Sequence, residues 1–215
     1  MSLWTYLNDQ HPRLLTGALE HATTVLECLA AATALGVAIA LATHRSRWAG
    51  DLASASAATV LTVPALALIG LLVALTGAGP VPALIALTLY GLLPVARSAI
   101  AGLRGVDPTL VEAARGIGMS RTSRLLRVEL PLAWPRILGG IRVATRLLMG
   151  IAAIAAYASG PGLGGEIFHG LAAPEDPGAL DRVLAGTLGI ALLSLLFEAG
   201  YVLLGRFTIA RGTRV

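Results

Sequence analysis

Lysine is absent from this 215-residue chain, so all sixteen of its basic residues are arginine. Without lysine the chain has no P-loop lysine, which excludes ATP hydrolysis by P-loop chemistry within it. Charged residues are scarce as well, at 13% against about 25% in soluble domains. Together with 56% hydrophobic residues and a mean hydropathy of +0.78, this composition is typical of a membrane protein.

Cysteine, histidine and aromatic residues are also too few for several kinds of site. The single cysteine, Cys28, excludes an intrachain disulfide. The four histidines lie far apart, with no cysteine or acidic residue at metal-ligand spacing, so we predict no metal site. No arrangement of nucleophile and base is evident, and no enzymatic activity is expected. Aromatic residues make up 5% of the chain, so an aromatic cage for a quaternary ammonium ion is not expected.

Five segments are apolar and long enough to cross a bilayer, which takes about twenty residues. They are residues 22–43, 53–76, 81–101, 138–159 and 183–205. The sequence therefore predicts an all-α integral membrane protein with one transmembrane domain over residues 22–205. Residues 1–21 are expected to form an extracytoplasmic, interfacial segment, and residues 206–215 a cytoplasmic tail.

The arginines are unevenly divided between the two predicted sides of the membrane. Fourteen lie on the side of the loop at residues 107–131, and only Arg13 and Arg182 lie on the other. Cytoplasmic loops carry an excess of basic residues. The division therefore predicts that the N-terminus is outside, whereas the C-terminus and this loop are in the cytoplasm.

Residues 107–131 form the longest polar interval of the chain and contain two helix signals. Asp107 is a good N-cap with Pro108 at the first helical position, and Thr109 with Glu112 offers an alternative capping box. Either signal predicts a short helix that begins near Asp107.

Two glycines and a proline divide the same interval. Gly116 and Gly118 are expected to interrupt the first helix, and Ser120 can cap a second helix that runs through Val128. Pro131 is expected to discourage further continuation. The pattern predicts two short helices joined at a glycine hinge.

The spacing Glu112-Ala113-Ala114, Gly118 and Val128-x-Leu130-Pro131 resembles the cytoplasmic EAA loop of ATP-binding-cassette (ABC) import permeases. Valine replaces the usual isoleucine at Val128. A solvated amphipathic linker is the alternative interpretation.

This resemblance implies the type I ABC-importer permease fold, in which the loop is a coupling helix that docks on a separate ATPase subunit. It further implies an extracytoplasmic substrate-binding protein and a second permease chain, identical or related. No cofactor is expected in this chain, because ATP and Mg²⁺ would bind the partner ATPase. The implied coupling residues are Glu112, Ala113, Ala114, Arg115, Gly118, Leu130 and Pro131.

Longer runs are similar to permeases of osmoprotectant importers, which take up glycine betaine, choline or carnitine. They are T-V-P-A-L-A-L-I-G-L-L at 62–72, L-Y-G-L-L-P-V-A-R-S at 89–98, V-E-L-P-L-A-W-P-R-I-L-G-G-I-R-V-A-T at 128–145 and the glycine-rich stretch at 159–171. Alternatives are an amino-acid or methionine permease of the same class, an ion-coupled secondary transporter, or a non-transporting membrane scaffold.

Five residues are candidates for a translocation path. Pro64 and Pro94 fall inside predicted spans, where each removes a helical hydrogen bond and is expected to kink its helix. Tyr90 and Tyr157 are two of the few aromatic residues in spans. Glu198 is a carboxylate within the fifth span, and such groups are functional candidates by default.

Three further features of the spans have alternative explanations. Arg142 and Arg146 share one helix face and either extend to the lipid headgroups or face the bundle or a partner ATPase. Glu27 lies in the outer part of the first span and is a weaker candidate than Glu198. Small residues allow close helix contact in membranes, and the glycines expected to do so are Gly36, Gly70, Gly139, Gly140, Gly150, Gly186 and Gly189.

Overall fold

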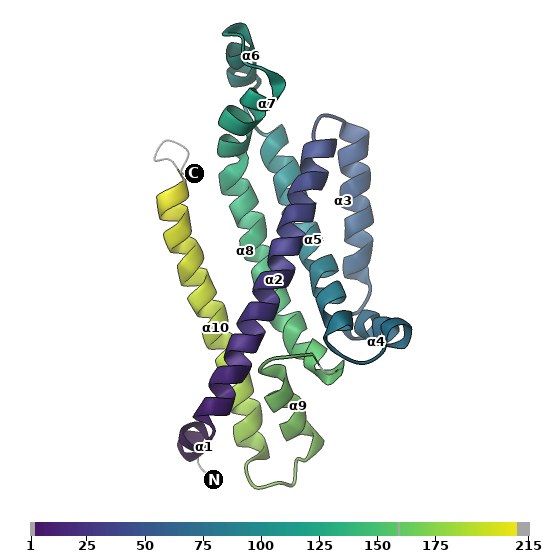
Figure 1. The fold of residues 1–215 in the computed structure, drawn as a ribbon, viewed down its shortest axis with the longest axis vertical. Helices are drawn as coiled ribbons and strands as arrows, with labels where there is room; N and C mark the ends of the chain where they lie inside the picture. Colours follow the sequence, from purple (N-terminus) through teal and green to yellow (C-terminus); the bar gives the residue numbers. More distant parts are fainter. Residues whose placement is uncertain (1–2, 159, 210–215) are drawn as a thin grey trace.

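The computed structural model describes residues 3–158 and 160–209, and all regular structure in these ranges is helical, as predicted. The helices are α1 (Leu3–Asp9), α2 (His11–Thr43), α3 (Arg47–Thr62), α4 (Ala65–Thr76), α5 (Pro80–Arg104), α6 (Pro108–Gly116), α7 (Arg121–Arg124), α8 (Leu130–Ala155), α9 (Gly164–Ala172) and α10 (Ala179–Thr208). A π-helical turn (Leu125–Glu129) joins α7 to α8, and a short 3-10 turn (Ala156–Ala158) follows α8. The long helices run along the long axis of the molecule, and α6 and α7 project beyond them at one end (Figure 1).

Among the described residues, four helical segments are long and apolar enough to cross a membrane, and a fifth arises if one bent pair counts as a span. The four are α2, α5, the continuous stretch 121–158 and α10, and the bent pair is α3 with α4. These segments overlap the five predicted spans. Ser159, at the end of the fourth predicted span, and residues 210–215 of the predicted tail lie outside the described residues.

The second predicted span is not one kinked helix, because α3 and α4 meet at 89°. Val63 adopts an extended backbone (φ −76°, ψ 129°), as the residue before a proline prefers. Its N–H reaches back to the carbonyl of Val60 at 3.2 Å, so that carbonyl is satisfied although Pro64 has no N–H to offer. Pro64 then precedes the first residue of α4. Pro94, by contrast, lies inside the uninterrupted α5.

The predicted boundary after residue 21 has no counterpart in the helices. α2 begins at His11 and continues without interruption to Thr43, so residues 11–21 belong to the same helix as the first predicted span. Only α1 is separate, and its Tyr6 is buried.

The core lies where α5 packs between α2 and α8. The buried face of α5 contains Ala83, Ala86, Leu87 and Tyr90, which recur at the three- and four-residue spacing of one helix face. At Gly140 of α8 a Cβ atom would lie 2.5 Å from the Cβ of a serine on α5, so glycine is needed there for close contact.

The predicted close-contact glycines fall into two groups. Those whose added Cβ would lie within 3.0 Å of a neighbouring element are Gly36, Gly140, Gly186 and Gly189. A Cβ added at Gly70, Gly139 or Gly150 would meet no atom of the described residues within 4 Å. Within the described part of this chain the prediction is therefore confirmed for the first group, whereas the second group makes no close contact, since glycine alone does not say which face of a helix is packed.

Candidate functional site

The projecting loop begins with a well-formed helix cap at Asp107. Its Oδ1 accepts hydrogen bonds from the backbone N–H and the hydroxyl of Thr109, both at 2.8 Å. These bonds stabilise the ionised form and hold the pKa of the Asp107 carboxyl below its usual value. The predicted cap at Asp107 is confirmed, and the alternative capping box is not used because the Thr109 hydroxyl donates to Asp107.

The glycine hinge is the C-terminal motif of α6. Gly118 has φ +83°, a left-handed conformation that other residues adopt at a cost. Its N–H donates to the carbonyl of Arg115 at 3.0 Å, and the next N–H, of Met119, reaches Ala114 at 3.1 Å. This pair of bonds is a Schellman motif, which satisfies the last carbonyls of the helix and reverses the chain. The predicted hinge is confirmed, with Gly118 as its left-handed residue.

The outer surface of α6 combines charge with exposed apolar side chains. Glu112, Ala113 and Arg115 are exposed, whereas Ala114 is only 6% exposed and faces the loop itself. Exposed apolar residues at helical spacing with Ala113 are Leu110 (47% exposed) and Ile117 (81% exposed). An exposed apolar stripe flanked by charges is typical of a surface that binds another protein.

The base of the loop differs from the prediction at Pro131. Ser120 caps α7 as expected, accepting a hydrogen bond from the N–H of Ser123 at 3.2 Å. The helix does not end near Val128 but continues through Pro131 into α8. Pro131 falls in the first turn of α8, directly after the π turn in which the Leu130 N–H bonds to the Leu125 carbonyl. A π turn changes the hydrogen-bond register, so the missing N–H of Pro131 does not terminate the helix.

Glu129 lies in the π turn, and no sequence pattern singles it out as a functional residue. It is 5% exposed and lies 3.1 Å from Nε of Arg124, 3.6 Å from Nε2 of His44 and 3.8 Å from Nη2 of Arg45. Its partners come from both sides of the loop base, α7 and the end of α2. This carboxylate therefore ties the projecting loop to the transmembrane bundle.

The α2–α3 turn, which carries two of these partners, is itself held by Arg104 at the end of α5. The guanidinium of Arg104 donates to the carbonyls of His44, Ser46 and Arg47 at 2.9–3.2 Å and pairs with Asp51 at 3.0 Å. The loop base is thus connected through Glu129 and Arg104 to three long helices.

The structure separates the five candidate path residues into three places. The hydroxyl of Tyr90 donates to the carbonyl of Val63, directly before Pro64, and Pro94 lies one turn further along α5. Tyr157 lies beyond α8 and is 67% exposed, with its ring 5.4 Å from that of Phe168. Glu198 lies on α10, away from both.

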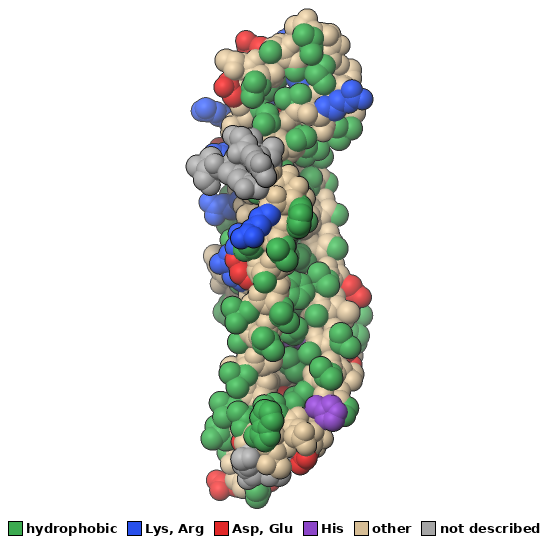
Figure 2. Space-filling view, turned by 90° about the vertical axis from the view of Figure 1, so that its left-hand side faces the viewer, with side chains coloured by type: hydrophobic (Ala, Val, Ile, Leu, Met, Phe, Trp, Pro, Cys, Tyr) green, Lys and Arg blue, Asp and Glu red, His purple; other side chains and the backbone are tan. Residues whose placement is uncertain are grey.

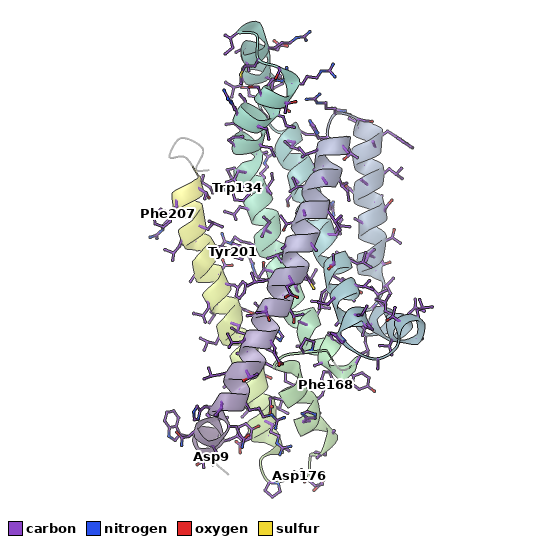
Figure 3. All side chains as sticks on the ribbon, in the orientation of Figure 1. Asp9, Trp134, Phe168, Asp176, Tyr201 and Phe207 are labelled. Atoms are coloured by element: carbon purple, nitrogen blue, oxygen red, sulfur yellow. The ribbon has the colours of Figure 1, made fainter. Side chains whose placement is uncertain are left out.

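Glu198 has two cationic partners on α8. Its carboxylate pairs with Nη2 of Arg142, and its second oxygen lies 3.6 Å from Nε of Arg146. Arg142 therefore faces α10, with its side chain 32% exposed, whereas the side chain of Arg146 is 59% exposed and reaches Glu198 from the surface. One turn further along α10, Tyr201 shares a 2.7 Å hydrogen bond with Thr145 of α8, and Tyr201 and Trp134 both lie at the α8–α10 contact (Figure 3).

The opposite end of the molecule has a separate buried carboxylate. Glu166 of α9 is 6% exposed and accepts a hydrogen bond from the Tyr6 hydroxyl at 2.8 Å, and Nε of Arg13 lies 2.8 Å from its other oxygen. Burial, followed by this contact with Glu166, raises the pKa of Tyr6 to about 12. These bonds fasten α1 and the start of α2 to α9.

A bundle of apolar helices long enough to cross a membrane, with a capped helical loop projecting from one end, is the architecture of a multi-pass membrane protein. Residues 32–209 match the family model described as binding-protein-dependent transport system inner membrane component. The chain belongs to this family. It is therefore a multi-pass inner-membrane permease subunit.

Known relatives agree with the resemblance seen in the sequence. The chain is 34% identical over 198 residues to the osmoprotectant import permease protein OsmW of Salmonella typhimurium, covering 90% of each chain. It is 32% identical over 198 residues to the choline transport system permease protein OpuBB of Bacillus subtilis, covering 92% of this chain and 88% of that one.

The fold also matches a solved structure. An inward-facing conformation of the MetNI methionine ABC transporter gives a TM-score of 0.78 at 19% identity, over 92% of this chain and 96% of that one. The predicted type I ABC-importer permease fold is thus confirmed.

Proposed function

We propose that this chain is one permease of a dimeric, ATP-driven importer that passes a small osmoprotectant into the cytoplasm. The substrate class is a quaternary amine such as glycine betaine, choline or carnitine. Support comes from the osmoprotectant and choline permeases to which the chain is similar over nine-tenths of its length. The partners are an extracytoplasmic binding protein, a second permease chain and a cytoplasmic ATPase that binds ATP and Mg²⁺.

The coupling loop is the feature on which this proposal depends most. In our account α6 docks on the ATPase through Glu112, Ala113 and Arg115, with Leu110 and Ile117 supplying apolar contact. Ala114 is small enough to let α6 pack closely on the rest of the loop, and Gly118 reverses the chain. Leu130 and Pro131, at the start of α8, carry the displacement of the loop into the bundle.

The orientation follows from the division of the arginines. The α6–α7 end carries most of them, so this end is cytoplasmic and α1 lies outside. The ATPase then meets α6 from the cytoplasm, and the binding protein approaches the end that contains α1 and α9. The proposed path passes the α3–α4 break, where Pro64, Tyr90 and Pro94 lie. Tyr157 and Glu198 flank this path at other depths in the membrane.

Two glycines of the loop provide a matched test. Gly118→Ala places a Cβ on a residue with φ +83°. Gly116→Ala falls on a helical residue, where the added Cβ meets no atom of the described residues within 4 Å. A non-glycine residue in the left-handed conformation costs about 1–2 kcal/mol. We expect Gly118→Ala, and more so Gly118→Val, to weaken ATPase co-purification and abolish uptake, while Gly116→Ala retains both.

Glu112→Lys reverses an exposed charge without changing the fold of the loop, so it should also reduce ATPase binding. The assay is uptake of radiolabelled glycine betaine by proteoliposomes that contain the assembled transporter and its binding protein. Full uptake by the Gly118 and Glu112 variants would refute the docking assignment. Transport of methionine in preference to betaine, choline and carnitine would retain the importer but overturn the substrate class.

A further inference from the structure

A groove lies between α3 and α5, on the side of the bundle opposite α10 (Figure 1). Its volume is about 420 Å³, which is within the range of small-molecule sites. Both helices line this α3–α5 groove, with Asp51, Ser54 and Ala58 among the lining residues of α3 and Arg97, Ile100 and Arg104 among those of α5.

The α3–α5 groove continues from the α3–α4 break towards the projecting loop. One face of α5 is marked by residues at alternating spacings of four and three, namely Tyr90, Pro94, Arg97, Ala101 and Arg104. Tyr90 contacts Val63 at the break, and Arg104 pairs with Asp51 near the start of α3. The groove therefore extends the proposed path to the end of the bundle where, on the α10 side, Figure 2 shows most of the basic side chains.

Arg97 carries the unpaired charge of the groove. Two arginines and one aspartate are among the lining residues, so one positive charge is left over. Arg104 is fully engaged, because its guanidinium donates to three backbone carbonyls and pairs with Asp51 at 3.0 Å. Arg97, by contrast, makes no hydrogen bond or ion pair with any described residue. The groove thus presents one free guanidinium.

Arg97 lies well inside its helix rather than at the membrane edge. It precedes Arg104, the last residue of α5, by seven residues, or about 10 Å at 1.5 Å per residue. Helical side chains lean towards the N-terminus of their helix, which for α5 is away from this end. An arginine at such a depth is costly against lipid and almost always faces the bundle or a water-filled cavity. The missing partner of Arg97 is therefore expected to be an anion that enters the groove.

A carboxylate is the anion that the proposed substrates carry. The planar guanidinium of arginine binds a carboxylate through two parallel hydrogen bonds. Alanines and Ile100 supply apolar contact for the methyl groups of a quaternary ammonium, and Asp51 supplies the opposite charge. Glycine betaine and carnitine contain both a carboxylate and a quaternary ammonium, whereas choline lacks the carboxylate.

We propose that Arg97 binds the carboxylate of the transported substrate in the α3–α5 groove, as the substrate moves from the α3–α4 break towards the projecting loop. The permease therefore favours zwitterionic osmoprotectants, such as glycine betaine and carnitine, over choline. This inference rests on the proposed transport of quaternary amines, and it adds the chemical group that the permease recognises and the residue that recognises it.

Uptake by proteoliposomes that contain the assembled transporter and its binding protein compares glycine betaine with choline in each variant. Arg97→Gln removes the charge but keeps a hydrogen-bonding side chain. It should lower the ratio of glycine betaine uptake to choline uptake about tenfold, because a hydrogen bond between charged groups is lost. Arg97→Lys keeps the charge and should restore most of this ratio. The matched control is Arg47→Gln, because Arg47 is exposed at the same end of the molecule and does not line the groove.

Thiol labelling tests the groove without the binding protein. The single cysteine, Cys28, is buried, so Cys28→Ala provides a background without thiols. In this background a membrane-impermeant maleimide should label Ser54→Cys in the assembled transporter, because Ser54 lines the groove. Glycine betaine should slow this labelling several-fold more than choline or acetate at the same concentration, and Arg97→Gln should abolish the difference. Labelling of Ser56→Cys, on α3 but outside the lining, should not respond to glycine betaine.

The inference is wrong if Arg97→Gln lowers the uptake of glycine betaine and choline equally, if Arg47→Gln changes the ratio as much, or if Ser54→Cys resists labelling. Equal protection by acetate would mean a site for any small anion rather than for the substrate. Absence of uptake of both substrates by the unaltered transporter would overturn the proposed function instead. The labelling experiment would then still decide whether the groove binds glycine betaine.

Discussion

Replacing Glu129 with glutamine should loosen the projecting loop from the bundle. The carboxylate is 5% exposed, and the side chains of Arg124 and His44 are 12% and 7% exposed, so removing its charge leaves nearly buried groups without their partner. Breaking a buried ion pair by removing one member costs about 3–5 kcal/mol. Glutamine keeps the shape and one oxygen acceptor, and the half-exposed Arg45 contributes no more than a surface pair, about 0–1 kcal/mol. We therefore expect about 3 kcal/mol.

Hydrogen exchange of the peptide spanning residues 121–129 measures this loss directly. A cost of 3 kcal/mol corresponds to opening about a hundredfold more often, because every 1.4 kcal/mol is a factor of ten. Asp51→Asn is the matched control, since Asp51 is 74% exposed and pairs with Arg104 at 3.0 Å near the same end of the molecule. That surface pair should change exchange by less than about fivefold.

The same variant should separate ATP consumption from uptake. If Glu129 ties the loop to the bundle, Glu129→Gln still binds the ATPase through α6, but it transports less substrate for each ATP hydrolysed. Unchanged exchange over residues 121–129, or an equal effect of Asp51→Asn, would show that Glu129 does not hold the loop in place.

Three further perturbations follow from individual contacts. Gly140→Ala should destabilise the protein by about 1–3 kcal/mol, because its Cβ would lie 2.7 Å from a backbone carbonyl of α5. Gly139→Ala should have little effect on stability, and thermal unfolding in detergent compares the two variants. Tyr90→Phe removes the hydrogen bond to the Val63 carbonyl and should cost about 1 kcal/mol, with faster exchange confined to the α3–α4 break. Because the pKa of Asp107 is lowered in the folded loop, its cap is fully formed above the ordinary carboxyl pKa and is lost only as the pH falls below that range. Asp107→Asn, a neutral cap, should abolish this pH dependence of α6 protection, measured relative to intrinsic exchange rates.

Features that depend on neighbours in sequence could be predicted. The cap at Asp107, the left-handed Gly118 and the second cap at Ser120 each involve residues within three positions, and local backbone chemistry decides them. The apolar segments that form the long helices are also a local property. At Pro64 and Pro131 the same reasoning was wrong. A kink was predicted at Pro64, where the helix breaks, and the end of a helix was predicted at Pro131, where the helix continues. A proline forbids one hydrogen bond, but whether the helix breaks or changes register depends on the packing around it.

Features that depend on distant residues could not be predicted. Arg142 and Glu198 are 56 residues apart, and the partners of Glu129 include His44 from another helix. Periodicity placed Arg142 and Arg146 on one face of α8, but it could not say which helix would cover that face. The exposure of Ile117 could not be predicted either, because sequence alone does not distinguish an apolar residue that faces the loop from one that faces a partner.

The continuation of the helix through Pro131 determines how the loop can act on the bundle. Residues 121–155 form one continuous helical segment that comprises α7, the π turn and α8. The base of the loop and the Arg142–Glu198 contact therefore lie on the same helical segment. Had the helix ended at Pro131, a displacement of α6 would have been absorbed by a flexible joint. We propose that a tilt at the loop base instead moves α8 against α10, whose contact includes the ion pairs of Glu198 and the hydrogen bond between Tyr201 and Thr145. Such polar contacts have specific geometry and exchange partners at small displacements, whereas the glycine-mediated packing of α8 on α5 resists sliding. The helix pair expected to change most during coupling is therefore α8 with α10, and the pair expected to move as one body is α8 with α5.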